Sequence, residues 1–150
     1  KNLIEEFKPN LDKKKLIVQN NLNKNTKVMA DKAALKLILT NFLSNAIKHS
    51  PKKALINLAE SSSSKGFVRL SVSDEGKGVP KKYKERVFER FYRIDKGRSS
   101  KTGGTGLGLS ISKNLALMMG YSVGVEANEP KGATFFIDIK VDEEKSIQAA

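Results

Sequence analysis

Residues 31–51 read DKAALKLILTNFLSNAIKHSP, and their apolar side chains follow the clearest periodic pattern in the chain. These apolar residues recur three and four positions apart, which is the spacing of one face of an α-helix. Asp31 is a residue type that caps helix N-termini, and a helix rarely continues through the residue before a proline such as Pro51. The stretch therefore predicts a helix that runs to about His49 and buries the face formed by Ala34, Leu35, Ile38, Leu39, Phe42, Leu43, Ala46 and Ile47.

On both sides of this helix, shorter apolar runs predict strands at residues 16–22, 27–30, 54–59, 67–73, 122–126 and 133–141. Further helices are predicted at 81–93 and at 106–119. Residues 1–14 are interpreted as the tail of a preceding helix and a linker, interrupted at Pro9, and residues 143–150 as a C-terminal tail. Because helices and strands do not alternate regularly, the predicted fold class is α/β, an α+β two-layer sandwich with a mixed sheet and helices on one face.

The composition excludes several classes of site. The 150 residues fit one globular domain with a substantial core. The absence of cysteine excludes disulfide scaffolds, cysteine–zinc sites and thiol catalysis, and the single histidine, His49, excludes histidine-cluster metal sites. No apolar run is as long as a membrane span. The formal charge of +12 predicts an anionic partner, which the composition leaves open among nucleotide phosphate, nucleic acid, an acidic protein and a membrane surface.

Three polar residues of the central helix are candidates for ligand binding. Asn41, Asn45 and Lys48 fall in one stripe, four and three positions apart, at the border of the apolar face. The carbonyl oxygen of an asparagine suits Mg²⁺, which also takes water and phosphate oxygens as ligands. The alternative interpretation is three ordinary surface residues.

The second candidate segment follows a predicted strand. Val68, Leu70 and Val72 alternate with polar residues, and Asp74 continues their parity, so its side chain is expected on the core side. A buried carboxylate needs a hydrogen-bond donor, and the exocyclic amine of adenine is one. Two glycines nearby, Gly76 and Gly78, would let the backbone approach a flat base closely. A plain turn with aspartate as its first residue is the alternative.

The third segment is rich in glycine and leads into a predicted helix. Its residues are Gly103, Gly104, Thr105, Gly106, Leu107, Gly108 and Leu109. Glycines permit backbone N–H groups to face an anion, and a helix N-terminus favours negative charge. The spacing is neither that of the dinucleotide-binding fingerprint nor that of a Walker A loop. We therefore expect phosphate binding by a different type of loop.

Between these segments, residues 77–102 contain ten basic and three acidic residues. We interpret this stretch as a basic flap beside a phosphate site, and the alternatives are a solvated charged face or a nucleic-acid patch. His49 is either a ligand-stacking residue or a structural one. Thr134 gives no signal when it is taken alone.

Together these segments resemble the catalytic, ATP-binding domain of bacterial sensor histidine kinases, in the superfamily that also contains the gyrase, chaperone and MutL ATPases. Residues 41–49 resemble the N box, 74–80 the first glycine box, 88–93 the F box, 103–109 the second glycine box and 132–135 the closing motif. The motifs occur in the family order and span about residues 15–141. The resemblance implies a Bergerat fold with a mobile ATP lid at about 81–105.

The resemblance also implies which residues face the phosphates and the metal. Asn45 would hold Mg²⁺ with Asn41 assisting, and Lys48 would contact the phosphates. Arg93 would reach the γ-phosphate, with Tyr92 beside it. The residues expected to act in catalysis are therefore Lys48, Arg93 and Asn41.

At the other end of the nucleotide, the resemblance implies that Asp74 binds the adenine amine and that Thr134 lies close to this contact. His49 stands where the family often has an aromatic residue, so it is a candidate for stacking. Loop residues would shape the pocket and the hinge of the lid, namely Gly76, Gly78, Gly104, Thr105, Gly106, Leu107 and Gly108.

The expected function is phosphoryl transfer from Mg²⁺·ATP to a histidine on a separate dimerisation domain. Gyrase-type ATPases carry a glutamate where this chain has Asn41, and an amide is a poor general base, which disfavours hydrolysis. The alternatives are a gyrase-type ATPase and a basic nucleic-acid-binding module. The resemblance further implies a dimerisation helix ending near residue 14, a response regulator receiver domain as downstream partner, no nucleic acid, and a cytoplasmic domain whose parent kinase is anchored in the cell membrane.

Overall fold

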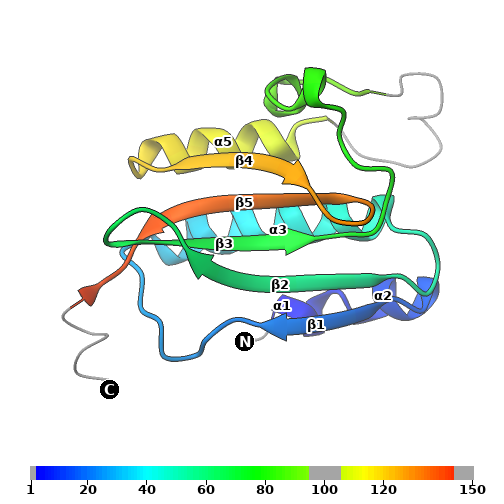
Figure 1. Cartoon of the computed structure of the whole chain (residues 1–150), viewed down its shortest axis with the longest axis horizontal. Helices are drawn as coiled ribbons and strands as arrows, with labels where there is room; N and C mark the ends of the chain where they lie inside the picture. Colours follow the sequence, from blue (N-terminus) through cyan, green and yellow to red (C-terminus); the bar gives the residue numbers. More distant parts are fainter. Residues whose placement is uncertain (1–2, 95–105, 144–150) are drawn as a thin grey trace.

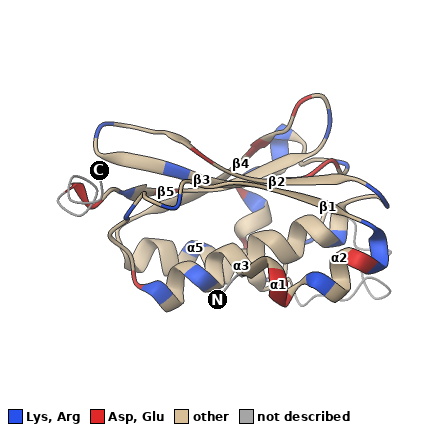
Figure 2. Cartoon of the chain, turned by 90° about the horizontal axis from the view of Figure 1, so that it is seen from below, with Lys and Arg blue, Asp and Glu red and all other residues tan. Residues whose placement is uncertain are grey.

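The computed structural model describes residues 3–94 and 106–143, which form one mixed sheet with its helices on one face (Figures 1 and 2). The strand order is β1-β2-β3-β5-β4. The strands are β1 (Ile17–Asn21), β2 (Leu55–Ser62), β3 (Phe67–Ser73), β4 (Ser122–Ala127) and β5 (Ala133–Lys140). The helices are α1 (Leu3–Glu6), α2 (Lys8–Lys14), α3 (Lys32–His49) and α5 (Gly108–Met118), with short 3₁₀ turns η1 (Lys81–Tyr83) and η2 (Arg86–Phe88).

The pairing of the strands makes the sheet mixed. β1 pairs with β2 in parallel, whereas β2–β3, β3–β5 and β5–β4 are antiparallel. The two central helices, α3 and α5, lie side by side beneath the sheet (Figure 2). The predicted fold class, with a mixed sheet and helices on one face, is therefore confirmed.

The core lies between the sheet and α3. Strands β3 and β5 alternate buried and half-buried residues, as expected for a sheet that is covered on one side. The rings of Phe42 and Phe135 pack with their centroids 5.8 Å apart. The buried side chains of these strands are Val68, Leu70, Val72, Ala133, Phe135, Ile137 and Ile139.

The other face of the sheet carries polar and charged groups instead of helices. Arg69 donates to Asp138 over 2.8 Å and to Glu126 over 2.9 Å. Its guanidinium also lies 3.6 Å from the ring centroid of Phe136. These contacts pair the charges on a face that no helix covers in the described part of the chain (Figure 2).

Two predicted elements are wrong. Residues 27–30 form no strand and contribute one isolated bridge, between Val28 and Val141, because so short a run makes too few backbone pairings to extend. Residues 81–93 form η1 and η2 instead of one helix. There the adjacent residues Val87 and Phe88 are both buried, and Phe91 has a φ of +63°, neither of which suits a continuous one-sided helix.

The N-terminal residues form two short helices, α1 and α2, with a break at Phe7. Pro9 lies in the first turn of α2, where its missing N–H costs no hydrogen bond. Leu11 of the same helix is only 6% exposed and belongs to the core. The domain boundary near residue 14 stays a prediction.

Within residues 3–94 and 106–143, none of the helices has the length and apolar character needed to cross a bilayer.

Candidate nucleotide-binding site

The helix α3 presents the first group of candidate residues. Asp31 caps it by accepting a hydrogen bond from the N–H of Ala34 over 2.8 Å. Asn41, Asn45 and Lys48 are all partly buried, along the border between the apolar face and the surface. The predicted helix and its polar stripe are therefore confirmed as structure, whereas the roles of the three residues stay predictions.

Asn41 joins α3 to the start of α5. Its Nδ2 donates to the carbonyl oxygen of Gly108 over 2.9 Å and to Oγ of Ser112 over 3.0 Å. Ser112 is fully buried and also donates to Gly108. The sequence analysis did not single out Ser112. Its place four residues after Gly108, one turn along the predicted helix, was the signal that could have found it. Asn41 thus orients the helix that follows the second glycine box.

Asn45 is the candidate magnesium ligand. Its partly buried side chain makes no hydrogen bond to any described residue. The described ranges contain no cluster of three or more histidine, aspartate or glutamate side chains that could hold a metal ion. An amide oxygen combined with phosphate oxygens and water is a donor set that Mg²⁺ accepts. The residues present therefore fit a magnesium ion that arrives together with a nucleotide.

Two cations from distant segments form the candidate phosphate site. The pKa of Lys48 is lowered, first by burial and then by the positive charge of Arg93. Arg93 is itself partly buried. Placing two like charges close together costs free energy that a bound anion would recover. This arrangement brings a cation of the N box close to a cation of the F box.

The two oxygens of the buried Asp74 carboxylate differ in their hydrogen bonds to the described residues. It is 2% exposed, and its Oδ1 accepts from the N–H of Gly76 over 2.8 Å and of Ala133 over 3.3 Å. Its Oδ2 accepts no hydrogen bond from any described residue. Burial raises the pKa of this carboxyl, and the two backbone hydrogen bonds oppose that rise. A buried acceptor without a donor is what an adenine amine would satisfy.

Thr134 is not brought to Asp74. Its hydroxyl lies 2.8 Å from that of Ser73, its partner on β3. Successive side chains alternate between the two faces of a strand. The side chain of Thr134 therefore points to the face without helices, and its neighbour Ala133 contacts Asp74 through the backbone.

Glycines of the first glycine box and of the closing motif allow close approach between protein segments. A Cβ on Gly76 would lie 2.5 Å from the carbonyl oxygen of His49, at the end of α3. Gly132 has a φ of +109°, and a Cβ there would lie 1.8 Å from the carbonyl oxygen of Asp74. Asn128 also holds that carbonyl, with its Nδ2 at 2.7 Å. The sequence analysis did not single out Asn128.

The residues around the expected lid are only partly described. Gly104 and Thr105 lie outside the described residues. Leu107 precedes α5, which begins at Gly108. Tyr92 packs against Tyr83, with ring centroids 6.1 Å apart, and lies 4.6 Å from the guanidinium carbon of Arg86. The F box is therefore held by local aromatic contacts.

His49 is the last residue of α3 and lies among charged groups. Its pKa is lowered, first by burial, and next by the positive charge of Lys48. Lys14 and Lys77 lower it further, whereas Asp74 raises it. His49 thus lies close enough to Lys48 and Asp74 to feel their charges, and its stacking role stays a prediction.

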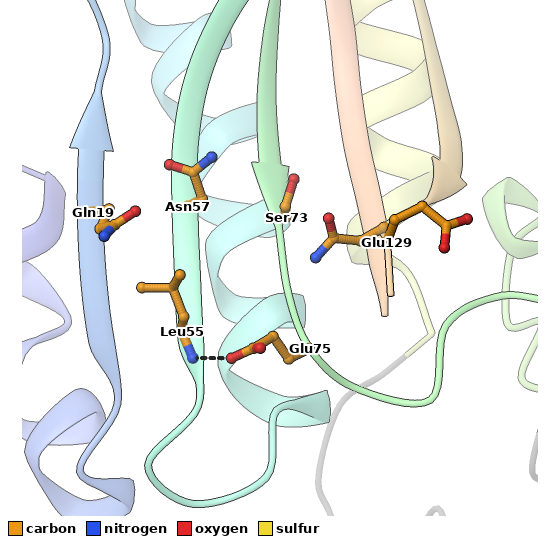
Figure 3. Close-up of a pocket in the computed structure, with 7 residues that line it drawn as sticks. Gln19, Leu55, Asn57, Ser73, Glu75 and Glu129 are labelled. Atoms are coloured by element: carbon orange, nitrogen blue, oxygen red, sulfur yellow. Dashed lines mark hydrogen bonds between the residues drawn. The ribbon is translucent and has the colours of Figure 1, made fainter. Parts of the chain in front are cut away.

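A separate small hollow lies on the other side of the sheet (Figure 3). Glu75 points into it and accepts a hydrogen bond from the N–H of Leu55 over 2.6 Å. This hollow of about 170 Å³ is lined by Gln19, Leu55, Asn57, Ser73, Glu75, Asn128 and Glu129. The side chains of Asp74 and Glu75 therefore lie on opposite faces of the sheet.

Comparison with known proteins identifies one family. Residues 30–143 match the family described as histidine kinase-, DNA gyrase B- and HSP90-like ATPase. The sensor histidine kinase WalK of Bacillus subtilis is 34% identical over 144 residues, covering 95% of this chain and 24% of WalK. The sensor-like histidine kinase SenX3 of Mycolicibacterium smegmatis is 39% identical over 113 residues, covering 75% of this chain and 29% of SenX3. The chain spans about a quarter of the length of these relatives.

Solved structures show the same architecture. Full-length ShkA in complex with AMPPNP superposes with a TM-score of 0.78 at 31% identity, covering 93% of this chain and 28% of ShkA. The mycobacterial sensor histidine kinase MprB superposes with a TM-score of 0.76 at 25% identity, covering 93% of this chain and 91% of that structure.

Proposed function

The chain belongs to the family of histidine kinase-, DNA gyrase B- and HSP90-like ATPases, and on this premise we propose that it binds Mg²⁺·ATP and presents the γ-phosphate to a histidine of a separate dimerisation domain. Nucleotide binding is an attribute of the family, and the resemblance stated from the sequence is confirmed. The observation that carries the proposal is the buried carboxylate of Asp74, whose Oδ2 lacks a donor among the described residues.

In this proposal, Asp74 selects adenine. The exocyclic amine of adenine donates to Oδ2, whereas guanine would place a carbonyl oxygen there and repel the carboxylate. The backbone N–H groups of Gly76 and Ala133 keep Oδ1 occupied and hold the carboxylate in place. Thr134 is left out of this contact because its hydroxyl is bonded to Ser73.

At the phosphate end, Lys48 and Arg93 bind and orient the triphosphate. Asn45 would hold Mg²⁺, which screens phosphate charge when it is bound. As the acceptor nitrogen bonds to the γ-phosphorus, the bond to the bridging oxygen breaks and ADP leaves. Lys48 and Arg93 stabilise the charge on the departing and transferred groups, so the chain contributes positioning and electrostatics.

Transfer is favoured over hydrolysis because the position of the water-activating glutamate is occupied by Asn41. Its amide nitrogen donates to Gly108 and Ser112 and serves to orient α5. An amide does not take a proton from water at neutral pH. We therefore propose that the isolated chain holds ATP without rapid turnover. The acceptor histidine, the downstream receiver domain and a membrane anchor belong to the proposed parent kinase.

Calorimetric titration tests this function. The chain is titrated with a non-hydrolysable ATP analogue, with and without Mg²⁺, and with the GTP counterpart. We expect Mg²⁺-dependent binding of the adenine nucleotide alone, and a loss of about ten- to a hundredfold in affinity for Asp74→Asn, since a hydrogen bond to a charged group contributes about 1.5–3 kcal/mol.

The matched control is Glu75→Gln. Its side chain still accepts from Leu55 on the opposite face of the sheet, so affinity should not change. Equal binding of both bases would refute the assignment of Asp74. Rapid phosphate release from ATP by the isolated chain would instead support a gyrase-type ATPase.

A further inference from the structure

The side chain of Lys14 caps the C-terminal end of α3. Its ammonium nitrogen, Nζ, donates to the carbonyl oxygens of Ile47, Lys48 and Ser50, at 2.8, 3.0 and 2.9 Å. An ammonium group has three protons to donate, so these contacts use its full capacity. The last carbonyls of a helix have no partner within the helix and carry the negative end of its dipole. Lys14 therefore satisfies both the hydrogen-bonding and the charge requirement of this helix end.

Lys14 is itself held firmly in place. It is the last residue of α2, whose Leu11 is buried in the core. Its own carbonyl oxygen accepts from the N–H of Lys53 over 2.9 Å. The pKa of Lys14 is lowered by burial, in keeping with an ammonium partly removed from water. The contact is thus an internal one between two elements far apart in sequence.

The same end of α3 is in close contact with the adenine end of the site. A Cβ on Gly76 would lie 2.5 Å from the carbonyl oxygen of His49. Gly76 in turn donates its N–H to Asp74. The last turn of α3 therefore lies between Lys14 on one side and the segment that holds Asp74 on the other. Lys48, on this turn, lies at the phosphate end.

We propose that Lys14 is a positioning residue of the nucleotide site, because it fixes the turn of α3 that carries Lys48 and abuts Gly76. The N-terminal helix α2 is thereby coupled to nucleotide binding, and a displacement of α2 would change ATP affinity. This inference rests on the proposed function. The residue acts through α3 and touches no substrate itself.

Four forms of the chain test the proposal: the parent, Lys14→Met, Lys14→Arg and the matched control Lys13→Met. The control removes the same charge from an exposed neighbour. We expect Lys14→Met to weaken binding of the Mg²⁺-bound ATP analogue by about tenfold, from the loss of charged hydrogen bonds at the helix end. Lys14→Arg keeps the charge but replaces the compact ammonium by a planar guanidinium, so its affinity should lie between that of Lys14→Met and that of the parent. Lys13→Met should bind as the parent does.

A nucleotide-free readout separates this contact from the proposed function. His49 is the single histidine, so its ring protons report its pKa directly by NMR. The charge of Lys14 lowers this pKa, after burial and the charge of Lys48. Lys14→Met should therefore raise the pKa of His49, while Lys14→Arg and Lys13→Met leave it near that of the parent.

Unchanged affinity in a folded Lys14→Met variant would overturn the proposal, whatever the pKa of His49. If that variant does not fold, Lys14→Gln replaces it, because glutamine still offers N–H donors but carries no charge, and unchanged affinity would again overturn the proposal. If the parent itself binds no nucleotide, the proposed function fails, and the His49 pKa still shows whether Lys14 acts on this turn.

Discussion

The N–H of Phe91 donates to the carbonyl oxygen of Gly106 over 2.8 Å, which closes the base of the segment between the F box and the second glycine box. Both residues have left-handed backbones, with φ of +63° and +73°. A Cβ on Gly106 would lie 2.9 Å from the Cα of Phe91. Phe91, which lies within the expected lid of residues 81–105, is thus held against Gly106, where an added Cβ has no room. The segment's residues 95–105 lie outside the described part.

The first prediction concerns this contact. Gly106→Ala should lower affinity for the ATP analogue by about tenfold, because relieving the clash separates the two segments that carry Arg93 and the glycine loop. Calorimetry measures the effect. The control is Gly120→Ala, which has a similar φ of +79° and no atom within 4 Å of the added Cβ. Both variants carry backbone strain, so a comparable loss in the control would show that the contact with Phe91 has no role.

The second prediction concerns the stability cost of Asp74. Its pKa is raised in the folded chain, so the folded state binds the proton more tightly than the unfolded state. Proton binding by Asp74 therefore stabilises the folded chain. This contribution to the free energy of unfolding is fully present below the ordinary carboxyl pKa of about 3.9 and is lost as pH rises through the pKa of the folded state.

Asp74→Asn should remove this pH dependence and leave the chain at least as stable at pH 7 as the parent, although it binds ATP less tightly. Urea unfolding across this pH range measures the free energy. Asp12→Asn, at an exposed site on α2, is the control. A marked loss of stability at pH 7 in Asp74→Asn would contradict the prediction.

The third prediction concerns the buried hydroxyl of Ser112. Ser112→Ala removes its hydrogen bonds with Asn41 and Gly108 and should lower the free energy of unfolding by about 1 kcal/mol. Nucleotide affinity should fall as well, because α5 is less firmly oriented. Ser44→Ala, at an exposed position of α3, is the control and should change neither quantity by much. Loss of stability with full affinity would limit Asn41 and Ser112 to a structural role.

The fourth prediction concerns the face of the sheet away from α3. Arg69→Met breaks the ion pairs with Asp138 and Glu126 and should cost about 1–2 kcal/mol of stability, because these groups are partly exposed. The difference from the parent should shrink in high salt. Nucleotide affinity should not change. Lys140→Met, an exposed lysine of β5, provides the charge-matched control. A loss of ATP affinity in Arg69→Met would show that the two faces of the sheet are coupled.

Local sequence patterns predicted much of the architecture. The helix at 32–49 and the strands β2, β3, β4 and β5 agree with their predicted ranges within a few residues, because each has a clear period of apolar residues and a distinct end. The parity of Asp74 with Val68, Leu70 and Val72 also predicted its burial. The failures, at 27–30 and 81–93, lie where the conformation depends on distant partners such as Val141 and Gly106.

The sequence by itself determined the helix of the N box, the helix-backed mixed sheet and the order of the nucleotide-binding motifs, because periodicity, capping and glycine spacing are local properties of a chain. Only the tertiary structure decided which groups meet. It turned Thr134 away from Asp74, joined Asn41 to Ser112, and placed Lys14 on the end of α3. Such contacts join residues that are tens of positions apart. Strand register and core packing set them, and the order of residues alone does not encode them in any local pattern.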